Sequence, residues 1–152
     1  MRPANWTGAL GLAFVLAVGP AIAQERGTPD EAKALVEKAA VHFKDVGADK
    51  AMTDFADPKG GYMDRDLFVF VYSADGKILS APGIPMLVGR DATTLKDADG
   101  KEFGKLIITA AKGGGGWAEY RMTNPVTKKA DNKKTYALQV GDYVLGAGAY
   151  TQ

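Results

Sequence analysis

The sequence predicts a single α+β domain, and three observations favour it. Near the start of the chain, hydrophobic residues recur at three- and four-residue spacings, as they do along one side of an amphipathic helix. Later, aromatic and β-branched residues gather in short runs bounded by turn-forming residues, which is typical of strands. The length of 152 residues allows one domain with a buried core.

The first 23 residues have the pattern of an export signal. Arg2 supplies a positive charge, residues 9–18 form an uncharged apolar run, and residues 21–23 read Ala-Ile-Ala, a small-residue cleavage site. The apolar run is shorter than the roughly 20 residues that a membrane span needs. We expect a cleaved signal peptide at 1–23, a mature domain at 24–152 and a periplasmic location; the alternative is an uncleaved membrane anchor.

Two helices are expected at the start of the mature domain. Thr28 can cap the first helix and Pro29 suits its first turn. Gly47 ends this helix, and a short second helix through residues 51–55 stops at Asp57-Pro58. The apolar stripe of the first helix consists of Ala32, Leu35, Val36, Ala39 and Phe43.

A hairpin follows the helices. Residues 67–72 (LFVFVY) and 77–80 (KILS) read as two strands, and Asp75-Gly76 supplies a tight turn between them. The prolines and glycine at 82–85 break the second strand and begin a loop.

The second half of the chain contributes one helix and three strands. A helix is expected at 101–112, ended by four glycines. The strands are expected at 117–122, 134–140 and 143–150. Because helices and strands are segregated along the chain, we expect the helices to lie on one face of an antiparallel sheet.

Composition excludes several kinds of function. Nineteen basic residues balance eighteen acidic ones, which leaves no strong positive field for nucleic acid or an anionic membrane. The chain has no cysteine, so a disulfide, a thiolate nucleophile and a thiolate metal site are all excluded. His42 is the only histidine, so a site with several histidine ligands is excluded as well.

No cofactor, metal ion or catalytic residue is expected, and the protein is predicted not to be an enzyme. Asp97-Ala98-Asp99-Gly100 resembles half of a calcium loop, but Leu95 and Leu106 stand where oxygen ligands are needed. Acid–base chemistry by a pair of carboxylates stays open, because the spatial pairing of side chains is not visible in a sequence.

Aromatic and basic residues on the strands are the candidate ligand-binding residues. Aromatic walls with one or two cations suit a small anion with an apolar body, such as a carboxylate. The alternative is that these are ordinary strand aromatics and solvated charges. Strand alternation also places Tyr120 on the opposite face from Trp117 and Arg121. The candidates are Tyr72, Trp117, Tyr120, Arg121, Lys133, Tyr136 and Tyr150.

Six segments between Tyr62 and Tyr150 follow the order and spacing of a known sensor family. They are FVYSADGKILSAP (70–82), PMLVGRD (85–91), LKDADGKEF (95–103), GWAEYRMTNP (116–125), KKTYALQV (133–140) and VLGAGAY (144–150). On these segments the chain resembles a single Cache domain of type 2, the extracytoplasmic small-molecule sensor of bacterial chemoreceptors and histidine kinases.

The resemblance implies a PAS-like sheet of about five antiparallel strands with a long N-terminal helix along one side. It also implies a small organic ligand, often a short carboxylate, bound between the sheet and its covering loops. The strand from Trp117 to Arg121, Lys133 with Tyr136, and Gly146-x-Gly148-x-Tyr150 match the pocket-side motifs of the family.

Two departures from the family bear on function. The family often has a histidine before the proline of the second strand, where this sequence has Ala81 before Pro82. Cache sensors usually continue into a membrane span and an output domain, whereas this sequence ends at Gln152. We therefore expect signal transduction through a partner, such as a membrane sensor or a transporter. The alternative is a periplasmic accessory subunit with an unused pocket.

Overall fold

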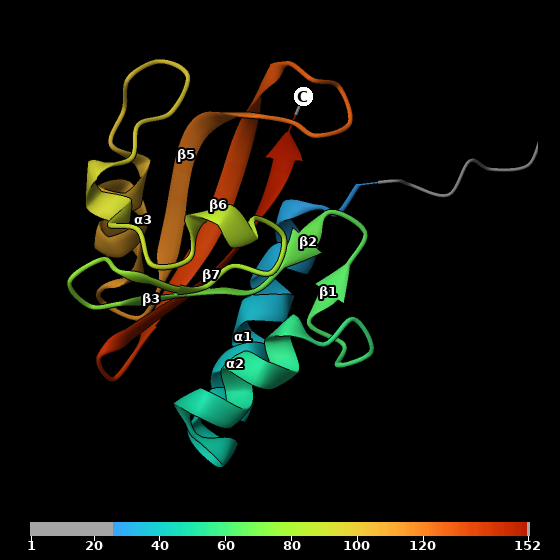
Figure 1. Ribbon diagram of the computed structural model, residues 1–152, viewed down its shortest axis with the longest axis vertical. Helices are drawn as coiled ribbons and strands as arrows, with labels where there is room; N and C mark the ends of the chain where they lie inside the picture. The colour runs from blue at the N-terminus through green and yellow to red at the C-terminus, as the bar shows by residue number, and fades with distance from the viewer. Residues whose placement is uncertain (1–25, 152) are drawn as a thin grey trace, which may run out of the picture.

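A five-stranded antiparallel sheet forms the centre of the protein, with helices on both faces (Figure 1). The computed structural model describes residues 26–151, so the predicted signal peptide at 1–23 lies outside the described residues. The strands are β3 (Phe70–Ser73), β4 (Ile78–Ser80), β5 (Gly116–Thr123), β6 (Ala130–Val140) and β7 (Tyr143–Thr151). Their order across the sheet is β4-β3-β7-β6-β5, which confirms the α+β class and the five-stranded sheet.

The two N-terminal helices are α1 (Pro29–Val46) and α2 (Ala48–Ala56), as the sequence predicts. The Thr28 side chain accepts a hydrogen bond from the backbone of Glu31, whose carboxylate in turn accepts from the backbone of Thr28. This reciprocal cap satisfies two donors that a helix N-terminus leaves free. Gly47 ends α1 at a φ of 83°, a conformation that glycine adopts without strain.

The helices lie on opposite faces of the sheet, so the prediction that they share one face is wrong. Val36 and Phe43 of α1 belong to one core, with Leu145 of β7. Helix α3 (Phe103–Ala111) belongs to the other core, with Val144 of β7. Strand β7 is buried on both faces, and a sheet with two apolar faces needs cover on each of them.

A small hairpin stands apart from the main sheet. Strands β1 (Met63–Asp64) and β2 (Leu67–Phe68) pair with each other, so the strand predicted at 67–72 is divided between β2 and β3. The turn between β1 and β2 contains Arg65 at a φ of 56°, an uncommon conformation for a residue with a side chain. Leu67 of this hairpin belongs to the core beneath α1, whereas Phe68 packs against the core on the other face of the sheet.

The segment between β4 and α3 contains two short 3-10 helices, η1 (Pro85–Leu87) and η2 (Ala92–Thr94). Gly83 in this loop approaches the ring of Phe68 so closely that an added Cβ would lie 2.2 Å from it. The loop therefore packs against the β1–β2 hairpin. Together they border the free part of the sheet face that α3 leaves uncovered.

Candidate ligand-binding site

A cavity of about 800 Å³ opens between the sheet and these two covering segments. Leu67 and Phe68 of the β1–β2 hairpin form part of its wall, and Ile84 and Leu87 come from the loop that contains η1. Four residues of the sheet also line it: Met122 and Thr123 of β5, Lys133 of β6 and Tyr150 of β7. The elements that build this cavity are thus distant in the sequence and meet only in the folded chain.

Lys133 is the charged residue buried at this cavity. It is 6% exposed, and its Nζ lies 4.7 Å from the centre of the Tyr150 ring and 5.7 Å from that of Phe68. Among residues 26–151 its ammonium has no hydrogen-bond or ion-pair partner. Every polar side-chain atom that is fully enclosed in that range does have a hydrogen-bond partner, so the Lys133 Nζ is not fully enclosed. The Nζ therefore keeps an opening to the cavity.

Burial also weakens the charge of Lys133. Loss of hydration lowers the pKa of the Lys133 ammonium to about 8, although the negative charge of Asp66 acts in the opposite direction. The two rings stabilise the cation only in part. An anion entering the cavity would meet an ammonium that has lost water and that no carboxylate of residues 26–151 contacts directly.

Two glycines of β7 make room for this arrangement. Lys133 pairs with Tyr150 across the two strands, and Thr135 pairs with Gly148. A Cβ at Gly148 would lie 2.8 Å from Cε of Lys133 and 2.3 Å from Oγ1 of Thr135. At Gly146 it would lie 2.2 Å from the ring of Phe70. The Gly-x-Gly-x-Tyr pattern therefore lets the lysine stem and the Phe70 ring lie flat on the sheet.

A smaller chamber of about 30 Å³ adjoins the cavity and shares Phe68, Met122 and Lys133 with it. Tyr120 lines this chamber, and its hydroxyl lies 2.7 Å from Oγ1 of Thr135, so both groups are satisfied. Burial raises the pKa of Tyr120, which keeps its hydroxyl neutral. Ala81 also lines the chamber, at the position where the family often has a histidine.

The structure brings four of the seven predicted residues together and separates the other three. Trp117 and Tyr136 lie on the opposite face, in the core beneath α1, with their ring centres 5.1 Å apart. Arg121 lines a separate polar cavity and binds Asp99 at 3.1 Å. Strand alternation is the physical reason for this separation. The residues brought together are Tyr72, Tyr120, Lys133 and Tyr150.

Sequence reasoning missed the apolar part of the wall. Met122 lies two residues after Tyr120 on the same strand, so the alternation of β5 could have identified it. Ile84 and Leu87 stand in a loop rich in proline and glycine, where no periodicity shows which side chains turn inward.

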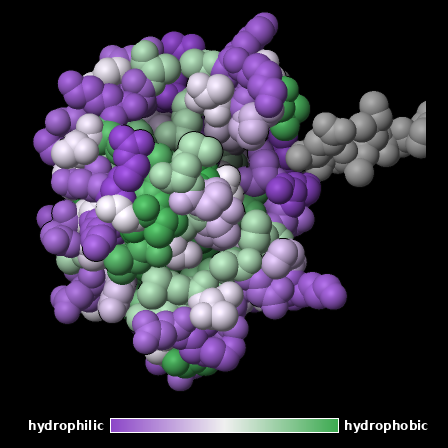
Figure 2. Space-filling view, in the orientation of Figure 1, coloured by the Kyte–Doolittle hydropathy of each residue, from purple (hydrophilic) through white to green (hydrophobic). Residues whose placement is uncertain are grey.

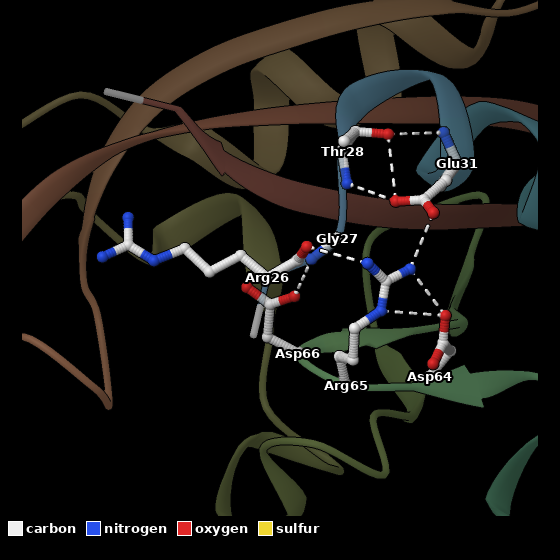
Figure 3. Close-up of polar contacts among 7 residues, drawn as sticks. All are labelled: Arg26, Gly27, Thr28, Glu31, Asp64, Arg65 and Asp66. Atoms are coloured by element: carbon white, nitrogen blue, oxygen red, sulfur yellow. Dashed lines mark hydrogen bonds and ion pairs between the residues drawn. The ribbon is translucent and has the colours of Figure 1, made fainter. Parts of the chain in front are cut away.

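A polar cluster fastens the β1–β2 hairpin to the beginning of α1 (Figure 3). The Arg65 guanidinium donates to Glu31 at 2.8 Å, to Asp64 at 2.7 Å and to the carbonyl of Arg26 at 2.9 Å. The Asp66 carboxylate accepts from the backbone of residue 27 at 2.5 Å. The ion pair with Arg65 and the Thr28 cap together lower the pKa of Glu31 to about 2. This cluster fixes the hairpin that forms one wall of the cavity.

The fold agrees with a comparison of the sequence with known families. A family model described as Single Cache domain 2 matches residues 11–152. The chain belongs to this family. Cache domains are extracytoplasmic sensor domains that bind small ligands and take part in signal transduction. The fold class, the PAS-like sheet and the resemblance stated from the sequence are therefore confirmed.

Relatives of this Cache domain occur in signalling proteins. The chain is 30% identical over 88 residues to the sensor histidine kinase MctS of Rhizobium johnstonii. This match covers 57% of the chain and 19% of the kinase, so the chain spans about a fifth of that relative. This likeness supports the assignment of the chain as a sensor domain. It does not assign the activity of the whole kinase to this chain.

Solved structures share the fold at low sequence identity. A methyl-accepting chemotaxis protein from Vibrio parahaemolyticus has a TM-score of 0.67 at 22% identity, covering 80% of this chain and 86% of that one. The periplasmic sensor domain of a chemotaxis protein has a TM-score of 0.61 at 21% identity, covering 81% and 90%. A Cache chemosensory domain studied for carboxylic acid recognition has a TM-score of 0.64 at 19% identity, covering 81% and 92%.

Two further properties concern only residues 26–151. None of the helices in this range combines the length and apolarity that crossing a bilayer requires. Within the same range, no three His, Asp or Glu side chains gather where a metal ion could bind.

Proposed function

We propose that this Cache domain is an exported periplasmic sensor that binds a small organic anion, such as a carboxylate, on the ammonium of Lys133. The proposal rests on Lys133, which is buried beside an apolar cavity and whose ammonium has no hydrogen-bond or ion-pair partner in the described part of the chain. A buried ammonium is unfavourable until a counter-ion joins it. The carboxylate of a guest would supply that counter-ion, while its carbon body would displace water from the apolar wall.

Known relatives support this choice of ligand class. One structural neighbour is a Cache domain with carboxylic acid recognition, and it shares the fold of this chain. We assign binding and not catalysis to the cavity, because Cache domains are sensor domains. Turnover of a bound carboxylate during prolonged incubation would overturn that assignment.

Binding in this cavity would reach the surface through its two covering segments. The β1–β2 hairpin and the loop with η1 both line the cavity and both have solvent-exposed residues. A guest that contacts Leu67 and Leu87 would hold these segments together. We propose that a membrane sensor or transporter partner recognises the pair of segments in this ligand-bound arrangement.

The test is ligand-dependent stabilisation of the mature protein against heat. Carboxylates at millimolar concentration should raise the melting temperature, and Lys133→Met should abolish the shift. Lys134→Met is the matched control, because Lys134 is the next residue of β6 but pairs with Glu119 on the opposite face. Loss of the shift in both variants, or in neither, would contradict the role of Lys133.

A second function, that of an accessory subunit with an unused pocket, is favoured by Ala81. The missing histidine leaves the inner chamber without that polar group, and only about 30 Å³ of space remains there. In this case native mass spectrometry would detect no ligand mass on the purified protein. A partner would be recovered from periplasmic extract whether or not carboxylates were added.

A further inference from the structure

The cavity is much larger than a short carboxylate. A water molecule takes up about 30 Å³ of the liquid, so an acetate ion with four heavy atoms fills roughly 120 Å³. The cavity measures about 800 Å³, which lies within the range of about 300–1,000 Å³ that encloses drug-sized ligands. Acetate on Lys133 would leave most of the apolar wall in contact with water.

The wall has the chemistry of a site for carbon chains or rings. Three methionines line it, Met63, Met86 and Met122, together with Ile84 and Leu87. Methionine is flexible and fills irregular gaps, so such a wall adapts to an extended apolar guest. In Figure 2, hydrophobic residues gather in the middle of the face shown and hydrophilic residues surround them.

Burial changes from the floor of the cavity to its mouth. Lys133 is 6% exposed and also lines the inner chamber, which places it at the floor. Met86 is 79% exposed and Val126 is 57% exposed, although both line the same cavity. These two side chains therefore stand at the mouth, where an apolar tail extending from Lys133 would cover them.

The other charged residues of the wall already have partners. Arg65 binds Glu31 and Asp64, and Asp66 accepts from the backbone of residue 27. Lys133 is thus the cation free to pair among the charged residues that line the cavity. A second carboxylate on the guest would lie against apolar side chains without a counter-ion, which disfavours dicarboxylates.

We infer that the guest is an amphipathic monocarboxylate, with its carboxylate on Lys133 and an apolar body of about six or more carbons reaching towards Met86 and Val126. The inference rests on the proposed function, because it needs an anion on Lys133. It adds the size of the guest, its single charge and its direction in the cavity. Each additional buried methylene should then raise affinity about fourfold.

The experiment is calorimetric titration of the mature protein at pH 7 with acetate, butanoate, hexanoate, octanoate and the dicarboxylate hexanedioate. We expect the dissociation constant to fall about fourfold for each methylene added between acetate and octanoate. Hexanedioate should bind at least tenfold more weakly than hexanoate. Equal affinity for acetate and hexanoate would overturn the inference and leave the proposed function intact. Equal affinity for hexanoate and hexanedioate would overturn the inference that the guest carries a single carboxylate. Binding of none of them would contradict the proposed function itself.

Met86→Ser tests the direction of the apolar body without disturbing the core, because Met86 is largely exposed. It should weaken octanoate binding at least threefold and leave butanoate binding unchanged. Val41→Ser is the matched control, since Val41 is 61% exposed on α1, which packs on the opposite face of the sheet. An unchanged octanoate affinity in Met86→Ser, or an equal loss in Val41→Ser, would overturn the placement of the tail.

Discussion

At the scale of single residues, Lys133 shows a conflict between stability and binding. Its stem fits over Gly148, and its ammonium lies 4.7 Å from the centre of the Tyr150 ring and 5.7 Å from that of Phe68, so the side chain is held in place at the cavity. The pKa of Lys133 falls from 10.5 to about 8 because burial removes water from the charged form. Without a ligand, the domain would therefore contain an unfavourable buried charge that a bound anion would neutralise.

Lys133→Met should make the unliganded protein more stable at neutral pH. Below pH 8 Lys133 is protonated in both the folded and the unfolded chain, so the folded state carries the whole penalty, of the order of 3 kcal/mol. Between pH 8 and 10.5 the unfolded chain binds more protons, and the stability of the original protein rises with pH. Urea unfolding should show a large difference between the two proteins at pH 7 and a small one at pH 10.5. A less stable Lys133→Met variant at pH 7 would contradict this account.

At the scale of elements, the β1–β2 hairpin is the least predictable part of the site. Each strand has only two residues, too few to show alternation in the sequence, and Arg65 occupies a turn conformation that its residue type does not favour. The longer elements have strong signals. Thr28 and Gly47 marked both ends of α1, and Gly141-Asp142 marked the turn between β6 and β7.

Acid should loosen the hairpin because Glu31 helps to hold it. The pKa of Glu31 is lowered from 4.5 to about 2 in the folded chain, so its contribution to stability is complete above pH 4.5. It is lost as the pH falls from 4.5 towards 2. Arg65→Ala removes the largest cause of the shift, so its stability should change less with pH over that range, as measured by urea midpoints.

Arg90→Ala serves as the control for this comparison, since Arg90 is another exposed arginine and lies outside the cluster. Its acid dependence should match that of the original protein. Hydrogen exchange in residues 62–68 should also accelerate in Arg65→Ala alone. Identical acid profiles for Arg65→Ala and the original protein would contradict the assigned role of the cluster.

At the scale of the whole molecule, the sheet divides two tasks between its faces. The face towards α1 is a closed core, whereas the other face is shared between α3 and the cavity. The alternation of side chains along the strands places Trp117 and Tyr136 on one face of the sheet and Lys133 and Tyr150 on the other. That part of the site could therefore be predicted from the sequence. The volume of the cavity was not predictable, because it depends on how loops distant in the sequence meet above the sheet.

The central claim is that the Lys133 ammonium pairs with the carboxylate of a guest. Titration of the Cε carbon of Lys133 by nuclear magnetic resonance measures this directly, with Lys133→Met identifying the signal. Without ligand, the pKa of Lys133 should be about 8, and saturating hexanoate should raise it by at least one unit, because an adjacent anion favours the charged form. A pKa that stays the same when hexanoate is bound would contradict the account.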